Sequence, residues 1–186
     1  MSRMHLHSVQ TAPSEIRPFI ERSVANNGFL PNLVATLANS PSAIAAYFTL
    51  GDINASGSLS LAEREVVQIV AATVHGCGFC VAGHTAVALK KAQLSDDIVQ
   101  AARDGQTIQD QRLNAVAKLT REVIASRGAV SDSALAAFKQ AGFNDQNALD
   151  VVLGVSLATL CNFANNLAGI DLNPQMHAYR WEPRKL

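Results

Sequence analysis

The sequence predicts an all-α fold, a single-domain helical bundle that associates into oligomers. Strand-type alternation of polar and apolar residues is almost absent, whereas residues that start and stop helices recur along the chain. The 186 residues suffice for one full hydrophobic core, and neither a linker nor a repeat divides them. Apolar residues make up 48% of the chain and charged residues only 16%, which favours a deeply packed body with further surface buried between copies.

Prolines, glycines and capping residues predict where each helix begins and ends. Pro31 and Pro41 each open a helix, and Ser60 with Glu63 has the spacing of a capping box. The caps expected for later helices are Ser95, Ser131 and Asn144, and the stops are Gly105, Gly128, Gly142 and Gly169. The expected helices cover residues 32–39, 42–53, 61–74, 78–92, 96–103, 111–126, 133–140 and 145–168.

These helices form one domain over residues 1–186, with a core of about 30–172 and irregular tails at both ends. The C-terminal tail starts at Asn173-Pro174 and contains the only tryptophan, Trp181. The helix after Ser60 is apolar nearly all round, so we expect it in the core or at an interface.

Charge and terminal composition argue against several classes of function. Fifteen basic and fifteen acidic residues give no net charge, and no Lys/Arg stripe appears, so nucleic-acid binding has little support. No segment has the apolar run of a signal peptide or of an uninterrupted membrane span, so we expect a soluble cytoplasmic protein without membrane contact. Thiols are kept reduced in that compartment, so close cysteines there indicate metal or redox chemistry.

Residues 73–84, TVHGCGFCVAGH, contain two cysteines, two histidines and three glycines. If a helix starts near Gly78, then Cys77, Cys80 and His84 share one face, because residues three and four apart on a helix are neighbours. A CxxC at a helix start also lies at the positive end of the macrodipole, beside unpaired backbone N–H groups. Both features lower the pKa of a thiol, and the thiolate is the reactive form.

This cluster supplies the groups that reduction of a peroxide requires. One thiolate attacks a peroxide oxygen and becomes a sulfenic acid, and a second thiol condenses with it to a disulfide. His84, one helical turn from Cys80, is placed for proton transfer. Glu65 lies next to a strongly apolar stretch, where burial would raise its pKa and suit it to pass protons.

The joint spacing of Glu65, Cys77, Cys80 and His84 resembles that of the alkyl hydroperoxidase D family, within the wider carboxymuconolactone decarboxylase-like superfamily. The family pattern is a glutamate, a CxxC twelve residues on, and a histidine four residues after the second cysteine, and this chain matches it without a gap. The segments GHTAVALKKAQLSDDIVQAARDG and LAAFKQAGFNDQNALDVVLGVSLATLCNF also resemble the peroxidase-related branch, so the resemblance covers about residues 30 to 172.

The resemblance implies an all-helical protein that forms a trimer or hexamer, has no cofactor, and reduces hydroperoxides through its CxxC. In the family the second cysteine attacks, which corresponds to Cys80, with Cys77 resolving and with Glu65 and His84 as a proton relay. Well-studied members carry another histidine just before the second cysteine, where this chain has Phe79. The sequence identifies neither the hydroperoxide nor the dithiol electron donor, for which a lipoyl protein and thioredoxin are candidates.

Other interpretations compete with a peroxidase. His75, Cys77, Cys80 and His84 could together bind zinc, although one ten-residue window closes poorly around a tetrahedral ion. A thioredoxin-like fold would need strands before the CxxC, and decarboxylase or lactone-type members of the superfamily lack this motif. The cysteines could also be idle in a structural protein.

The remaining cysteine and histidines receive no catalytic role. We expect Cys161 to be a small residue of the hydrophobic core. His5, His7 and His177 lie in the tails, and the role of His75 is left open.

Overall fold

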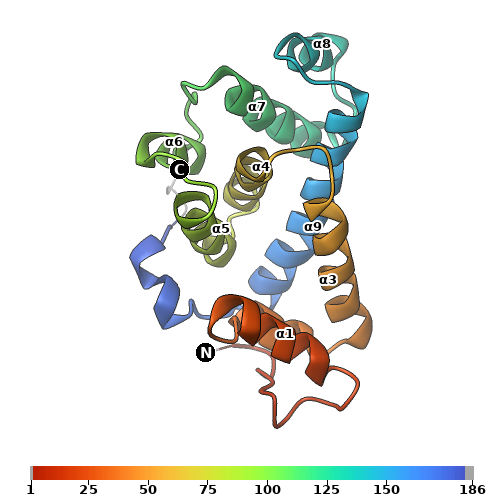
Figure 1. The fold of residues 1–186 in the computed structure, drawn as a ribbon, viewed down its shortest axis with the longest axis vertical. Helices are drawn as coiled ribbons and strands as arrows, with labels where there is room; N and C mark the ends of the chain where they lie inside the picture. Colours follow the sequence, from red (N-terminus) through yellow and green to blue (C-terminus); the bar gives the residue numbers. More distant parts are fainter. Residues whose placement is uncertain (1, 183–186) are drawn as a thin grey trace.

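The computed structural model describes residues 2–182, and within this range every regular element is a helix (Figure 1). The elements are α1 (Arg17–Asn27), α2 (Asn32–Leu37), α3 (Pro41–Ala55), α4 (Leu61–Val74), α5 (Gly78–Lys90), α6 (Asp96–Asp104), α7 (Gln111–Ser126), α8 (Asp132–Gln140), α9 (Asp145–Ala168) and the 3₁₀ helix η1 (Pro174–Tyr179). The predicted all-α fold class is confirmed, whereas the oligomeric state stays a prediction.

Helix α4 lies at the centre of the bundle, where it contacts α5, α6, α7 and α9 (Figure 1). Every side chain from 65 to 72 is buried, as expected for a helix that is apolar nearly all round. The predicted capping box is present: Glu63 Oε2 accepts the Ser60 N–H at 2.8 Å, and Ser60 Oγ accepts the Glu63 N–H at 3.3 Å. This box fixes the start of the helix that carries Glu65.

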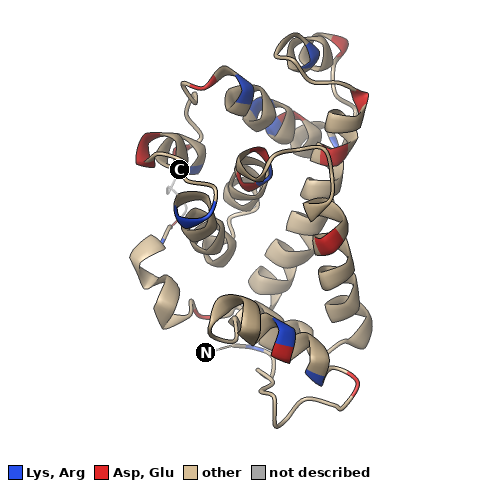
Figure 2. Cartoon of the chain, viewed as in Figure 1, with Lys and Arg blue, Asp and Glu red and all other residues tan. Residues whose placement is uncertain are grey.

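Helix α9 runs beside α2, α3, α4 and α7 and carries few charged residues (Figure 2). Gly154 lets it approach α4 closely, because a Cβ at this position would lie 2.9 Å from Val67 Cγ1. The side-chain amide of Gln68 on α4 donates to the carbonyl oxygen of Gly154 at 3.0 Å, which stabilises the contact between α4 and α9. By length and composition α9 is also long and apolar enough to cross a membrane, and its contacts with α2, α3, α4 and α7 pack one side of it against the bundle.

The hydrophobic core has two parts. One contains apolar residues of α4, α6 and α7 together with Phe138 and Phe143. The other joins the N-terminal residues, α2 and α3 to the start of α5, and it includes Cys77, Cys80 and Cys161. The two cysteines of the CxxC therefore lie in the half of the core that α1 to α3 cover.

Three local features differ from the sequence-based expectation. Helix α1 was not expected; its signals are the proline near its start and Gly28, which ends it in the left-handed conformation with φ 76°. Ser95 is the N-cap of α6, but its side chain makes no capping hydrogen bond. The C-terminal tail is partly regular, because η1 packs on α5 with Met176 close to Gly83.

Candidate active site

The link between α4 and α5 places both cysteines at the start of α5. His75 ends α4, Gly76 takes up the left-handed conformation with φ 66°, and Cys77 is the N-cap of α5. The Sγ of Cys77 accepts the backbone N–H of Cys80 at 3.4 Å, one of the N–H groups that a helix start leaves unsatisfied. The predicted helix start at Gly78 is confirmed, and the CxxC lies at the positive end of the helix dipole.

Both thiols are free and buried, with 1% of Cys77 and 4% of Cys80 exposed to solvent. A hydrogen bond from the Cys80 thiol lowers the pKa of Cys77 to about 7, against the opposing effect of burial. The same hydrogen bond, together with burial, raises the pKa of Cys80 well above 9.0. The two thiols therefore titrate as a coupled pair, in which the hydrogen bond lowers the pKa of Cys77 and raises that of Cys80.

The structure brings Glu65 of α4 and His84 of α5 together, with Glu65 Oε2 at 2.8 Å from His84 Nδ1. Burial acts to lower the pKa of His84, but the charge and hydrogen bond of Glu65 outweigh it and raise this pKa above 6.5. The positive charge of His84 in turn helps to lower the pKa of Cys77. Because Glu65 occupies Nδ1, the Nε2 atom is the ring nitrogen left for proton exchange.

Two asparagines of α9 join this site, and sequence reasoning missed both. Asn165 Nδ2 lies 3.0 Å from Cys80 Sγ and 3.7 Å from Cys77 Sγ. The side chain of Asn162, one turn earlier, also acts to lower the pKa of Cys80. Both asparagines are buried, at 3% and 1% exposure. The signal that could have found them is a pair of amides with helical spacing in an otherwise apolar helix.

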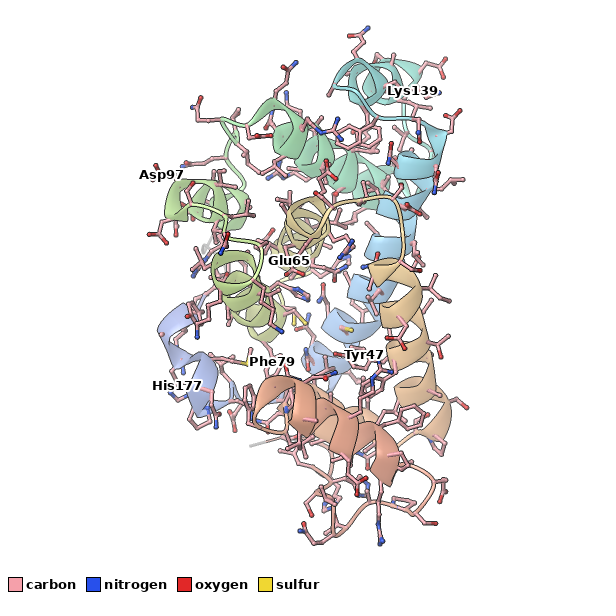
Figure 3. All side chains as sticks on the ribbon, viewed as in Figure 1. Tyr47, Glu65, Phe79, Asp97, Lys139 and His177 are labelled. Carbon is pink, nitrogen blue, oxygen red and sulfur yellow. The ribbon has the colours of Figure 1, made fainter. Side chains whose placement is uncertain are left out.

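Tyr47 and Cys161 border the thiols from α3 and α9. Figure 3 labels Tyr47, Glu65 and Phe79, which come from three different helices and surround the centre of the bundle. Burial, followed by the nearby Cys161 and Cys80, raises the pKa of the Tyr47 phenol. Cys161 is buried as predicted, and burial raises its pKa to about 12, so it stays a protonated thiol at neutral pH.

The other histidines of the sequence cluster and of the tails engage other partners. His75 Nδ1 lies 3.0 Å from Asn162 Oδ1, and its ring packs edge-on against Phe163. His5 and His7 contact each other edge-on near the N-terminus, and His177 Nε2 lies 3.3 Å from the Leu172 carbonyl oxygen.

A zinc site would require four ligands that converge on one point. The two candidate histidines, His75 and His84, instead contact different partners. His75 faces Asn162 and His84 faces Glu65. Among residues 2–182, no three His, Cys, Asp or Glu side chains group as a metal site would require. Phe79, noted above as a departure from the family pattern, packs against the apolar cluster around the thiols.

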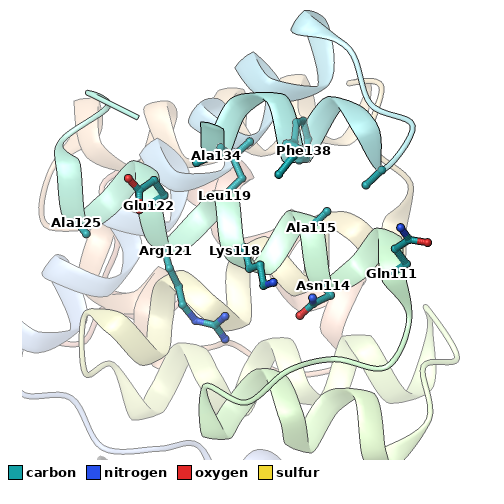
Figure 4. A pocket seen from close by; sticks show the side chains of 12 residues that line it. Gln111, Asn114, Ala115, Lys118, Leu119, Arg121, Glu122, Ala125, Ala134 and Phe138 are labelled. Atoms are coloured by element: carbon teal, nitrogen blue, oxygen red, sulfur yellow. The ribbon is translucent and has the colours of Figure 1, made fainter. Parts of the chain in front are cut away.

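A hollow of about 280 Å³ adjoins the CxxC at Gly78. Its other lining residues are Ile170, Asp171, Leu172, His177, Arg180 and Trp181. A larger hollow of about 680 Å³ lies between α7 and α8 and is shown in Figure 4. Its lining includes Lys118, Arg121 and Phe138 but no cysteine or histidine, so the smaller hollow is the one next to the candidate chemistry.

Comparisons with known proteins agree with this fold. Residues 41–122 match the carboxymuconolactone decarboxylase family. A peroxidase-related protein from Ralstonia eutropha JMP134 with an alkylhydroperoxidase AhpD core is 24% identical, with a TM-score of 0.84 and 94% of both chains covered. A peroxidase-related protein from Silicibacter sp. TM1040 is 15% identical, with a TM-score of 0.78, covering 94% of this chain and 92% of that one. No curated protein matches the sequence.

A third solved structure is that of the debrominase Bmp8, in which a cysteine-to-alanine variant binds 2,3,4-tribromopyrrole. It is 15% identical, with a TM-score of 0.78 and 96% of both chains covered. These likenesses establish a shared fold. The chain is thus similar to the carboxymuconolactone decarboxylase family over residues 41–122, and it shares the fold of these solved structures over nearly its whole length.

Proposed function

We propose that this protein is a thiol-dependent peroxidase that reduces alkyl hydroperoxides or hydrogen peroxide. The observation that carries the proposal is the grouping of a buried dithiol with a glutamate–histidine pair. Cys77 and Cys80 lie together at the start of α5, where Cys77 Sγ accepts the Cys80 N–H, and Glu65 Oε2 holds Nδ1 of His84, further along the same helix, at 2.8 Å. A nucleophile, a resolving thiol and a proton carrier are the groups that the reaction uses.

The reaction is a two-electron oxidation of the dithiol. The Cys80 thiol gives its proton to Cys77, and the Cys80 thiolate attacks the distal oxygen of the hydroperoxide. The O–O bond breaks, the alkoxide takes a proton from His84 and leaves as an alcohol, and Cys80 becomes a sulfenic acid. Cys77 then attacks the Cys80 sulfur and releases water, which leaves a Cys77–Cys80 disulfide. Glu65 stabilises the protonated form of His84 before the proton is transferred.

A dithiol donor must then reduce the disulfide, and we propose a lipoyl protein or thioredoxin. The hollow beside Gly78 is the proposed route by which substrate and donor reach the sulfurs, since both cysteines are otherwise enclosed. Its lining by Arg180, Trp181 and residues of the tail makes the C-terminal segment part of this route.

Peroxide consumption with each donor in turn tests the proposal. Reduced protein is mixed with cumene hydroperoxide or hydrogen peroxide, together with dihydrolipoamide, thioredoxin or glutathione and the matching NADPH- or NADH-coupled reductase. We expect turnover with at least one dithiol and the loss of two free thiols per chain when no donor is present. Cys161→Ser is the matched control and should keep both the turnover and the loss of two thiols per chain. An unchanged thiol count after peroxide treatment would overturn the proposal.

Reductive dehalogenation is a second candidate, because the same dithiol can deliver two electrons to an aryl bromide. Tyr47, Phe48, Phe79 and Trp181 pack against the apolar cluster that contains the cysteines, which suits an aromatic substrate. A thiolate would take the bromine and the ring would take a proton; the second thiol would then form the disulfide and release bromide. Bromide release from 2,3,4-tribromopyrrole without hydroperoxide turnover would favour this activity over the first.

A further inference from the structure

The side-chain amide of Asn165 contacts the cysteine sulfurs through its nitrogen, whereas its oxygen has no hydrogen-bond partner among the described residues. Its Nδ2 atom approaches Cys80 Sγ at 3.0 Å and Cys77 Sγ at 3.7 Å. Its Oδ1 atom is buried and has no hydrogen-bond partner among the residues that the structure describes. A buried carbonyl oxygen without a donor costs folding free energy, so its presence beside a reactive group asks for an explanation.

The neighbouring asparagine on the same helix shows the contrast. Asn162 is buried as deeply, but its Oδ1 lies 3.0 Å from His75 Nδ1 and is therefore satisfied. The amide of Asn166 is also engaged, because its Nδ2 donates to the His75 carbonyl oxygen at 2.9 Å. Of the two buried amides, Asn162 and Asn165, only that of Asn165 has a side-chain oxygen without a partner among the described residues, and this amide lies at the dithiol.

An alkyl hydroperoxide carries a hydrogen-bond donor that suits this acceptor. Its single O–H is on the distal oxygen, which is the atom that a thiolate attacks. Once a sulfur has lost its proton, that sulfur cannot satisfy the Asn165 oxygen and instead accepts hydrogen bonds. An incoming hydroperoxide that donates to Oδ1 would hold its distal oxygen beside the sulfur that Nδ2 contacts.

We infer that Asn165 binds both reactants, donating from Nδ2 to the Cys80 thiolate and accepting from the hydroperoxide O–H at Oδ1. This inference rests on the proposed peroxidase function. In the attack step the new S–O bond forms as the O–O bond breaks, and the leaving alkoxide takes its proton from His84. The distal oxygen keeps its hydrogen, which stays hydrogen-bonded to Asn165 Oδ1, and becomes the oxygen of the Cys80 sulfenic acid.

The thiolate half of the inference is tested on reduced protein without any peroxide. The rate of alkylation by iodoacetamide is measured against pH in a Cys77→Ser, Cys161→Ser background, which leaves Cys80 as the reporting thiol, for Asn165→Ala and Asn165→Asp, with Asn166→Ala as the matched control. Loss of a hydrogen bond to a charged sulfur should move the midpoint of the profile up by about one unit or more in both Asn165 variants. Asn166→Ala should leave it in place. A midpoint that does not move in Asn165→Asp, which keeps the shape of asparagine, would overturn this half.

The substrate half uses turnover at a pH where the thiolate is formed in every variant. Asn165→Asp keeps an acceptor oxygen, whereas Asn165→Ala has none, so KM for cumene hydroperoxide should rise about tenfold more in the alanine variant. Equal KM values in the two variants would contradict the acceptor role. If the wild-type protein turns over no hydroperoxide, the proposed function fails and the substrate half fails with it, but the alkylation profile still decides the thiolate half.

Discussion

At the scale of single residues, the proposed chemistry depends on Glu65, which raises the pKa of His84 against the effect of burial. The two side chains come from different helices and meet at 2.8 Å, with Glu65 only 7% exposed. Replacing Glu65 by glutamine keeps the shape of the side chain but removes the charge that favours protonated His84. We expect Glu65→Gln to slow peroxide turnover by about 10²-fold, the lower range for general acid–base help. Steady-state kinetics at neutral pH measure this, with the exposed Glu21→Gln as a control. Unchanged turnover would leave Glu65 as a structural residue.

The same pair should make stability depend on pH in a defined direction. The pKa of His84 is raised above 6.5 in the folded state, so its stabilising contribution is fully present below 6.5 and is lost as pH rises through the folded value. Glu65→Gln should therefore cost more unfolding free energy at low pH than at high pH. Urea denaturation of both proteins at about pH 5.5 and about pH 9 gives the two differences. A larger difference at the higher pH would contradict this assignment of charge.

The roles of the two sulfurs are decided by trapping the sulfenic acid. The hydrogen bond between the thiols lowers the pKa of Cys77 and raises that of Cys80, whereas the proposed attack comes from Cys80 after its proton has moved to Cys77. In Cys77→Ser, peroxide should leave a sulfenic acid on Cys80 that a dimedone probe labels, and no disulfide can form. In Cys80→Ser the probe should find little on Cys77. Mass spectrometry locates the label, and the reverse pattern would exchange the roles. Labelling of neither cysteine would remove the peroxidase proposal.

At the scale of helices, the site requires α9 to lie close against α4. Gly154 makes this approach possible, since a Cβ there would meet Val67 Cγ1 at 2.9 Å. Gly154→Ala should force the helices apart and lower the unfolding free energy by about 1–3 kcal/mol, as overpacked cores do. It should also weaken the Asn165–Cys80 contact further along α9. Gly51→Ala in α3 is the matched control, because nothing lies within 4 Å of its Cβ, and it should stabilise by about 0.5–1 kcal/mol. Equal effects in urea denaturation would refute the packing argument.

At the scale of the whole molecule, one face of α9 stays uncovered. Leu149, Phe163 and Leu167 are 68%, 55% and 62% exposed, and α9 carries few charges. We expect a second copy of the chain to cover this face in a symmetric homo-oligomer, a trimer or hexamer by family resemblance. Leu167→Glu should shift the assembly towards the monomer, and the exposed Gln175→Glu should not. Light scattering at micromolar concentration gives the mass, and a single-chain mass for the wild type would contradict the prediction.

The fold class and much of the candidate site were predictable because they depend on local chemistry. Helix caps, glycine stops and apolar runs are properties of short segments, and so is the spacing that puts Cys77, Cys80 and His84 on one helix face. Helix α1 was missed because its N-cap residue, Ile16, has no capping side chain and because its apolar residues do not form a pronounced stripe.

The contacts between distant segments were settled only by the tertiary structure. Glu65 meets His84 because α4 and α5 pack together, and Asn165 reaches the thiols from a helix more than eighty residues further on. The sequence shows that Asn165 is polar within an apolar helix, but the direction of its amide depends on how α9 lies on α4. The sequence by itself therefore determined which groups were available for redox chemistry. The packing of α4, α5 and α9 decided which of them meet and in which direction their pKa values shift, because burial and neighbouring groups set those shifts.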